Sequence, residues 1–175
     1  MKGEIIILIY FCIYTFLGYC MESLYVSILN KKWISSGLFQ GPFIPLYGIG
    51  ACILIILSSY ISSHFIAFIG GGIIMTSLEY IASLYIEKIF HQKCWDYSQH
   101  FCQIHGRICL LYFIIWCFLS DFFIFFIHPF ISQYIVINEI TLVISVIYII
   151  FILKSFFEKL LKLYYKKSTK KGIVS

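Results

Sequence analysis

The chain has 175 residues, of which 61% are hydrophobic, 20% aromatic and only 12% charged. A soluble domain could not bury that much apolar surface, so the composition excludes a soluble globular protein and indicates a membrane protein. The formal net charge of +5 does not indicate a nucleic-acid partner, because the basic residues lie at the ends of apolar segments and in the C-terminal tail.

Five apolar segments follow one another along the chain, each close to the roughly 20 residues that span a bilayer. The first is a retained helix rather than a signal peptide, because it is long, lacks a small-x-small exit and contains Glu22. A turn at residues 62–64 precedes the third segment, and His128 with Pro129 breaks the chain before the fifth. We predict membrane-spanning helices over about 5–29, 43–61, 65–90, 108–127 and 134–153.

The predicted fold is therefore an all-α polytopic membrane helix bundle of about five transmembrane helices. Residues 1–153 form the transmembrane domain, and residues 154–175 form a basic amphipathic cytoplasmic tail. The mixture of lysines and aromatic residues in the tail suits contact with anionic membrane lipids. The alternative is a solvated extension of the last helix. Seven cysteines, an odd number lying partly within apolar runs, do not form a predicted disulfide framework.

Orientation follows from the basic residues, which stay on the cytoplasmic side of a membrane. Twelve of the thirteen Lys and Arg residues lie in the first loop, the third loop and the tail, whereas the second and fourth loops have none. This alternation predicts a cell-membrane protein with its N-terminus outside and its C-terminus in the cytoplasm. An even number of helices fits the pattern less well, because neither the fourth segment nor the tail is long enough for two spans.

Two glutamates lie inside predicted spans, where a charged side chain costs roughly 2.5–3.5 kcal/mol and usually has a function. Glu22 and Glu79 each precede a cytoplasmic lysine, Lys31 and Lys88, by nine residues. At 1.5 Å per residue both lie at a matching depth, about 13 Å from that boundary. Asp121 and Glu139 lie farther toward the outer side, which favours structural or rim roles.

The third segment carries a polar seam, whose members recur at helical spacing and should face inward. They are Gly72, Thr76, Glu79, Ser83 and Glu87. A shorter version on the first segment includes Glu22 and Tyr25. We predict a substrate path lined by Glu22, Glu79, Tyr25, Ser83 and Glu87. The alternative is that both buried glutamates are protonated and hydrogen-bonded, and serve only packing.

The matched glutamates belong to a weak internal repeat. In each half, a helix with an acid leads to a basic loop and then to a glycine that opens the next helix. Gly41 and Tyr47 share the spacing of Gly106 and Tyr112. This predicts a parallel two-helix repeat, helices 1–2 and 3–4, with Glu22 and Glu79 facing each other across a pseudo-two-fold axis.

The third loop has the densest chemistry in the chain. Its predicted site consists of Trp95, Asp96, Tyr97, Ser98 and Arg107. The aromatic residues suit the membrane interface, where Asp96 and Arg107 could pair or bind a lipid phosphate. The loop's Cys and His residues form no paired C-x-x-C, so we predict no metal site and no cofactor. The chain also lacks a nucleotide-binding loop, so any ATPase would be a separate subunit.

Four stretches of the sequence together resemble the CmpB-type family, catalogued as ABC-transporter type IV proteins, over about residues 11–110. They are Leu17–Glu22 with Tyr25 and Ser27; Gly37–Pro42 with Pro45–Gly48; Leu78–Tyr80 through Glu87–Phe90; and Trp95–Ser98 leading to Gly106 and Arg107. Within the second stretch, the structural loop residues are Gly37, Gly41, Pro42, Pro45 and Gly48. The chain departs from the family pattern at Ser35–Ser36 and at Gln103.

The resemblance implies a multi-pass membrane protein with a permease label. Our leading hypothesis is a permease-like transporter component without enzymatic activity, whose paired glutamates line a polar path. It is expected to form a homodimer or to bind a separate ATPase. One rival is an enzyme or binding protein that acts on lipid head groups, with Glu87, Asp96, Tyr97 and Arg107 as its polar cluster. The other is a regulatory or assembly subunit without catalytic activity.

Overall fold

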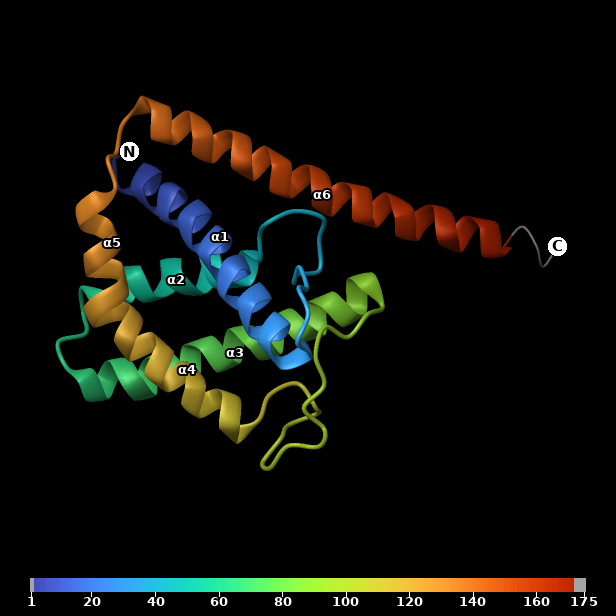
Figure 1. The fold of residues 1–175 in the computed structure, drawn as a ribbon, viewed down its shortest axis with the longest axis horizontal. Helices are drawn as coiled ribbons and strands as arrows, with labels where there is room; N and C mark the ends of the chain where they lie inside the picture. Colours follow the sequence, from blue (N-terminus) through green and yellow to red (C-terminus); the bar gives the residue numbers. More distant parts are fainter. Residues whose placement is uncertain (1, 172–175) are drawn as a thin grey trace. The chain divides into compact units, whose positions relative to one another are not determined.

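The computed structural model describes residues 2–171, with side chains described for residues 3–165. Figure 1 shows the helices. They are α1 (Lys2–Asn30), α2 (Pro45–Ser58), α3 (His64–Phe90), α4 (Leu110–Phe122), the π-helix η1 (Phe123–Ile127), α5 (His128–Tyr134) and α6 (Glu139–Lys171). In the described part of the chain the extended structure consists of one isolated bridge between Ile104 and Ile108. The predicted all-α membrane fold is confirmed.

Four helical segments are long and apolar enough to cross a bilayer: Gly3–Asn30, His64–Phe90, Leu110–Tyr134 and Glu139–Tyr165. The predicted second span, 43–61, is wrong in length, because α2 contains only 14 residues, or about 21 Å of helix. The N–H groups of Phe43 and Ile44 bond to the carbonyls of Gly41 and Thr15, at 2.9 and 3.2 Å, so both residues belong to the preceding loop. The helix begins at Pro45, where the missing N–H of proline costs nothing.

The predicted break at His128 and Pro129 is also wrong. The N–H of His128 bonds to the carbonyl of Phe123, five residues earlier, and α4, η1 and α5 form one continuous span. The π-helical turn inserts one extra residue directly before Pro129, and such a local irregularity is where a continuous helix can hold a proline, which lacks an N–H.

The last helix begins later and extends farther than the sequence predicted. Asn138 caps it, because its side-chain oxygen accepts the N–H of Thr141 at 2.9 Å and Thr141 Oγ1 accepts the N–H of Asn138 at 3.0 Å. Glu139 is therefore in the first turn of α6, at the start of the candidate span. The helix runs without interruption through the predicted domain boundary at residue 153. The basic side chains at 166–171 and residues 172–175 of the predicted tail lie outside the described part.

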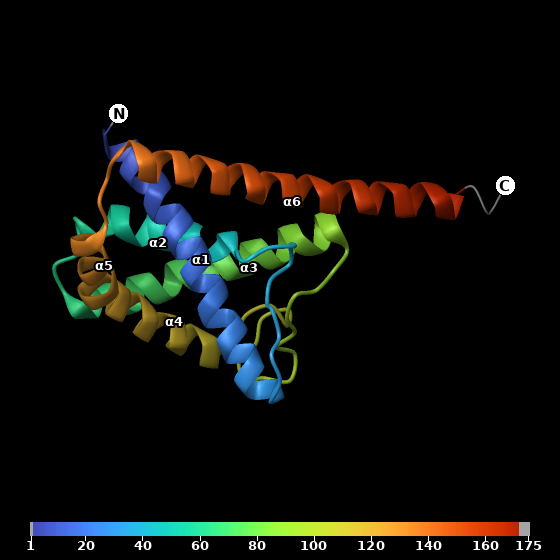
Figure 2. The same ribbon diagram turned by 45° about the horizontal axis from the view of Figure 1, so that its top comes forward.

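The chain divides into two compact units, which we describe separately. The first contains α1, the loop that follows it and α6 (Figures 1 and 2). Its centre is Phe43, which is completely buried and meets the rings of Tyr148 and Phe151 edge-on. The loop therefore packs directly against α6.

The second unit contains α2, α3, α4, η1 and α5. Small residues let α3 and α4 approach closely: a Cβ atom added to Gly71 would lie 2.3 Å from Ser120 Cβ, and one added to Gly72 would lie 2.2 Å from Cys117 Sγ. Met75 of α3 similarly fills the space beside Gly50 of α2. This packing fixes the helix α3, on which the candidate site lies.

Candidate functional site

The carboxylate of Glu79 lies in the interior of the second unit, with 5% of the residue's surface exposed. Tyr97 Oη donates to its Oε1 at 2.9 Å, and Trp116 Nε1 donates to its Oε2 at 3.0 Å. Each carboxylate oxygen therefore has a donor from a different element, the loop after α3 in one case and α4 in the other. Both oxygens of the buried carboxyl group therefore accept a hydrogen bond inside a membrane span.

Arg107 joins the end of the same loop to the last turns of α3. Its guanidinium donates to Ser83 Oγ at 2.8 Å and to the carboxylate of Glu87. The Arg107 side chain is only 17% exposed, whereas that of Glu87 is 39% exposed. Glu79, Ser83 and Glu87 are spaced four residues apart, so three consecutive turns of α3 bind the loop through one face.

Backbone geometry inside the loop brings Tyr97 and Arg107 to α3 together. The N–H of Tyr97 bonds to the carbonyl of Gly106 at 2.8 Å, and Trp95 Nε1 donates to the carbonyl of Arg107 at 2.9 Å. Gly106 has a φ of +66°, which favours glycine. A Cβ atom there would also lie 2.8 Å from Asp96 Oδ1. The glycine therefore allows residues 95–97 and residues 106–107 to lie close enough to form these two hydrogen bonds.

Asp96 has a different environment from the one that the sequence predicted. Its carboxylate accepts the N–H of Ser98 at 3.0 Å and lies 4.0 Å from Lys93 Nζ. The hydrogen bonds from the backbone and side chain of Ser98 lower the pKa of Asp96. Arg107 pairs with Glu87 instead, so the predicted pairing of Asp96 with Arg107 is not formed.

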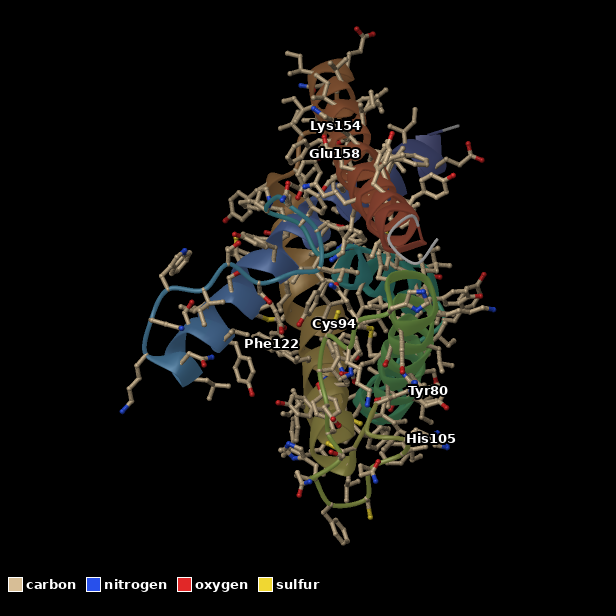
Figure 3. All side chains as sticks on the ribbon, turned by 90° about the vertical axis from the view of Figure 1, so that its right-hand side faces the viewer. Tyr80, Cys94, His105, Phe122, Lys154 and Glu158 are labelled. Atoms are coloured by element: carbon tan, nitrogen blue, oxygen red, sulfur yellow. The ribbon has the colours of Figure 1, made fainter. Side chains whose placement is uncertain are left out.

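Three aromatic contacts of the site were not predicted from the sequence. The ring of Tyr97 stacks on that of Tyr112 with 4.4 Å between centroids, and Tyr47 lies against Trp116 with 5.8 Å between centroids. Tyr80 Oη is 3.0 Å from His105 Nδ1 (Figure 3). Trp116 gives the one usable signal, because an indole within an apolar span needs an acceptor for its N–H.

The other predicted path residues, Glu22 and Tyr25, lie on α1 in the first unit. Glu22 is half-buried and Tyr25 is exposed. Glu22 thus belongs to a different unit from Glu79, and the predicted repeat with its facing glutamates stays a prediction.

The predicted structural loop residues follow α1. Gly37 and Gly41 have φ values of +113° and +141°, which favour glycine. Gly41 also leaves no room for a side chain, because an added Cβ would lie 2.2 Å from the Phe43 ring. Pro45 begins α2, and Gly48 is buried within it.

The loop after α1 is also fastened to α6, which the sequence did not reveal. Ser155 Oγ donates to the carbonyl of Gln40 at 2.9 Å and accepts its N–H at 3.1 Å. Lys159 Nζ donates to the carbonyl of Leu38 at 2.5 Å, and Tyr148 Oη donates to the carbonyl of Pro42 at 2.7 Å. These side chains of α6 supply partners for the backbone of an irregular segment.

Neither site holds a cluster of metal-ligating side chains among the described residues. No curated protein and no solved structure matches the chain. The model of one family, described as "Putative ABC-transporter type IV", matches residues 9–158. The match includes α3, the loop after it and most of α6. The chain is therefore a membrane protein that belongs to the CmpB family.

Proposed function

We propose that the chain is a permease-like component of a transport system, in which Glu79 is an acidic group of a polar path. The observation that carries the proposal is the position of this carboxylate: it is buried, in the middle of a span, and bonded at both oxygens by Tyr97 and Trp116. A buried acid held by neutral donors can bind a cation or accept a proton. Glu22 on α1 is the second acid that we propose for the path.

The family supports a second component, because type IV ABC transport requires ATP and we found no nucleotide-binding motif in the sequence. We propose a separate ATPase subunit on the cytoplasmic side. We propose the same side for the loop after α3 and the end of α6, because basic residues favour the cytoplasmic side of a membrane. Contact with anionic lipids and a homodimer also belong to this proposal.

The rival function in lipid head-group binding has less support. A phosphate at the loop would need the donors of Tyr97 and Arg107. The hydroxyl of Tyr97 already donates to Glu79, and the guanidinium of Arg107 already donates to Ser83 and Glu87. A head group would have to displace these contacts.

Glu79→Gln tests the transport function. The purified protein, alone and with any ATPase that copurifies with it, is reconstituted into vesicles of neutral and anionic lipid. An imposed proton, Na⁺ or K⁺ gradient is then followed with an internal dye. We expect the wild-type protein to dissipate at least one of these gradients faster than protein-free vesicles do. We expect Glu79→Gln to lower that rate to the protein-free level, because an amide cannot carry the negative charge.

Glu158→Gln is the matched control, since Glu158 is an acid on α6 that lies beside Lys154 at 3.9 Å (Figure 3). Its flux should equal that of the wild type. Equal flux in the Glu79→Gln and wild-type vesicles would contradict the path. Loss of partner association without loss of flux would instead identify a regulatory or assembly subunit.

A further inference from the structure

We propose that the loop over residues 91–109 is a lid that closes the cytoplasmic approach to Glu79, with Tyr97 as its closing residue and Arg107 as its clasp. This inference rests on the proposed function of Glu79. It adds the element that controls access to the acid and the residues that hold that element shut.

The two donors to Glu79 differ in how easily they can leave. Trp116 lies on α4, whose backbone packs against α3 at Gly72, so the indole N–H remains beside Oε2. Tyr97 lies on an irregular segment, and irregular segments move more readily than packed helices. Movement of the loop would therefore take the Tyr97 donor away from Oε1, while Trp116 stayed beside Oε2.

The position of Tyr97 in the closed lid is well defined. Its ring stacks on Tyr112 of α4 and meets His100 edge-on, with 5.6 Å between centroids. These contacts orient the hydroxyl toward Glu79, whose Oε1 it reaches at 2.9 Å. A cation that approached Glu79 from this side would have to displace the hydroxyl before it could bind Oε1.

Arg107 holds the lid at the other end. Its contacts combine an ion pair with Glu87 and a hydrogen bond to the hydroxyl of Ser83, and the guanidinium is mostly shielded from water. Tyr80 and His105 add a third point of attachment. The lid therefore contacts α3 over three turns, from Glu79 to Glu87.

The lid should move as one body, because its two ends are bonded to each other. The bond from Tyr97 N–H to Gly106 and the bond from Trp95 Nε1 to Arg107 join the segment 95–97 to the segment 106–107. Release of Arg107 from Glu87 should therefore also displace Tyr97 from Glu79. This coupling distinguishes a lid from two unrelated contacts.

The test reads access to Glu79 directly, without a transport assay. A hydrophobic carbodiimide adds to a protonated carboxyl group to give a stable N-acylurea, which mass spectrometry locates on a peptide. In protein reconstituted into nanodiscs, we expect Tyr97→Phe to raise the labelling rate of Glu79 on the order of tenfold, the change that loss of one hydrogen bond produces in an opening equilibrium. We expect Arg107→Gln to raise the same rate and to speed amide hydrogen exchange over residues 95–108.

Tyr85→Phe and Lys88→Gln are the matched controls, since both side chains are exposed on α3. Both controls should behave as the wild type does, and exchange over α6 should be unchanged in every variant that folds. Wild-type labelling in Tyr97→Phe would overturn the lid. So would faster exchange in Arg107→Gln without faster labelling of Glu79. If labelling rises but no variant affects flux, the lid stands and the transport function fails.

Discussion

At the scale of single residues, Gly106 sets the path of the lid. It takes a positive φ, and a side chain there would press on the carboxylate of Asp96. We expect Gly106→Ala to lower the free energy of unfolding by about 1–2 kcal/mol, because an L-residue in the left-handed region costs that much. Denaturant titration in mixed micelles measures the change. The rate of amide hydrogen exchange over residues 95–108 should rise in the same variant.

Gly70→Ala is the control with the opposite sign. Gly70 lies within α3, and a Cβ atom added there meets nothing within 4 Å. Alanine is the better helix former, so this variant should gain up to about 1 kcal/mol. A loss of stability in Gly70→Ala, or none in Gly106→Ala, would contradict this account of the two glycines.

The sequence shows the polar face of α3 but not the side chains that bond to it. The spacing of Glu79, Ser83 and Glu87 was readable, because helical periodicity is local. Their donors, Tyr97, Trp116 and Arg107, lie between 18 and 37 residues away from them. Which donor bonds to which acid depends on how the loop folds back onto α3, and for this reason the sequence alone does not distinguish Asp96 from Glu87 as the partner of Arg107.

At the scale of elements, the sequence predicts the long helices, but not the residue at which α2 begins or the continuity of α4 with α5. Apolar runs of about 20 residues identify spans directly. The start of α2 depends on a bond from Ile44 to Thr15 of α1, and the continuity of α4 with α5 depends on one π-helical turn. Both are set by backbone hydrogen bonds that the sequence around Pro45 and Pro129 does not specify.

Ser155 joins two elements of the first unit, and this contact can be tested. Its hydroxyl satisfies both backbone groups of Gln40, and the residue is 5% exposed. We expect Ser155→Ala to cost about 1–3 kcal/mol, because two backbone polar groups lose their partner. Amide exchange over residues 36–44 should rise. Ser59→Ala, at an exposed serine that bonds only within its own turn, should change neither quantity; equal effects in the two variants would contradict the contact.

At the scale of the whole molecule, α2 decides the topology. Four segments are long enough to span a bilayer, and α2 is shorter, at about 21 Å against a hydrocarbon core of about 30 Å. If α2 crosses, five spans place the two termini on opposite sides. If it does not, four spans place them on the same side. The basic residues distinguish these cases, because Lys31 and Lys32 precede α2 and the turn that follows it has none.

We therefore expect α2 to cross the membrane, with the N-terminus outside and the C-terminus in the cytoplasm. A short helix can span where the bilayer thins locally, at a cost of fractions of a kcal/mol per Å of mismatch. Reporters active on only one side of the membrane, fused at the N-terminus, after Lys32 and at the C-terminus, measure the arrangement. The N-terminal fusion should report the outer side and the other two the cytoplasm. A cytoplasmic N-terminus together with an external reporter after Lys32 would show that α2 does not cross. It would also place the loop after α1 on the opposite side from the lid.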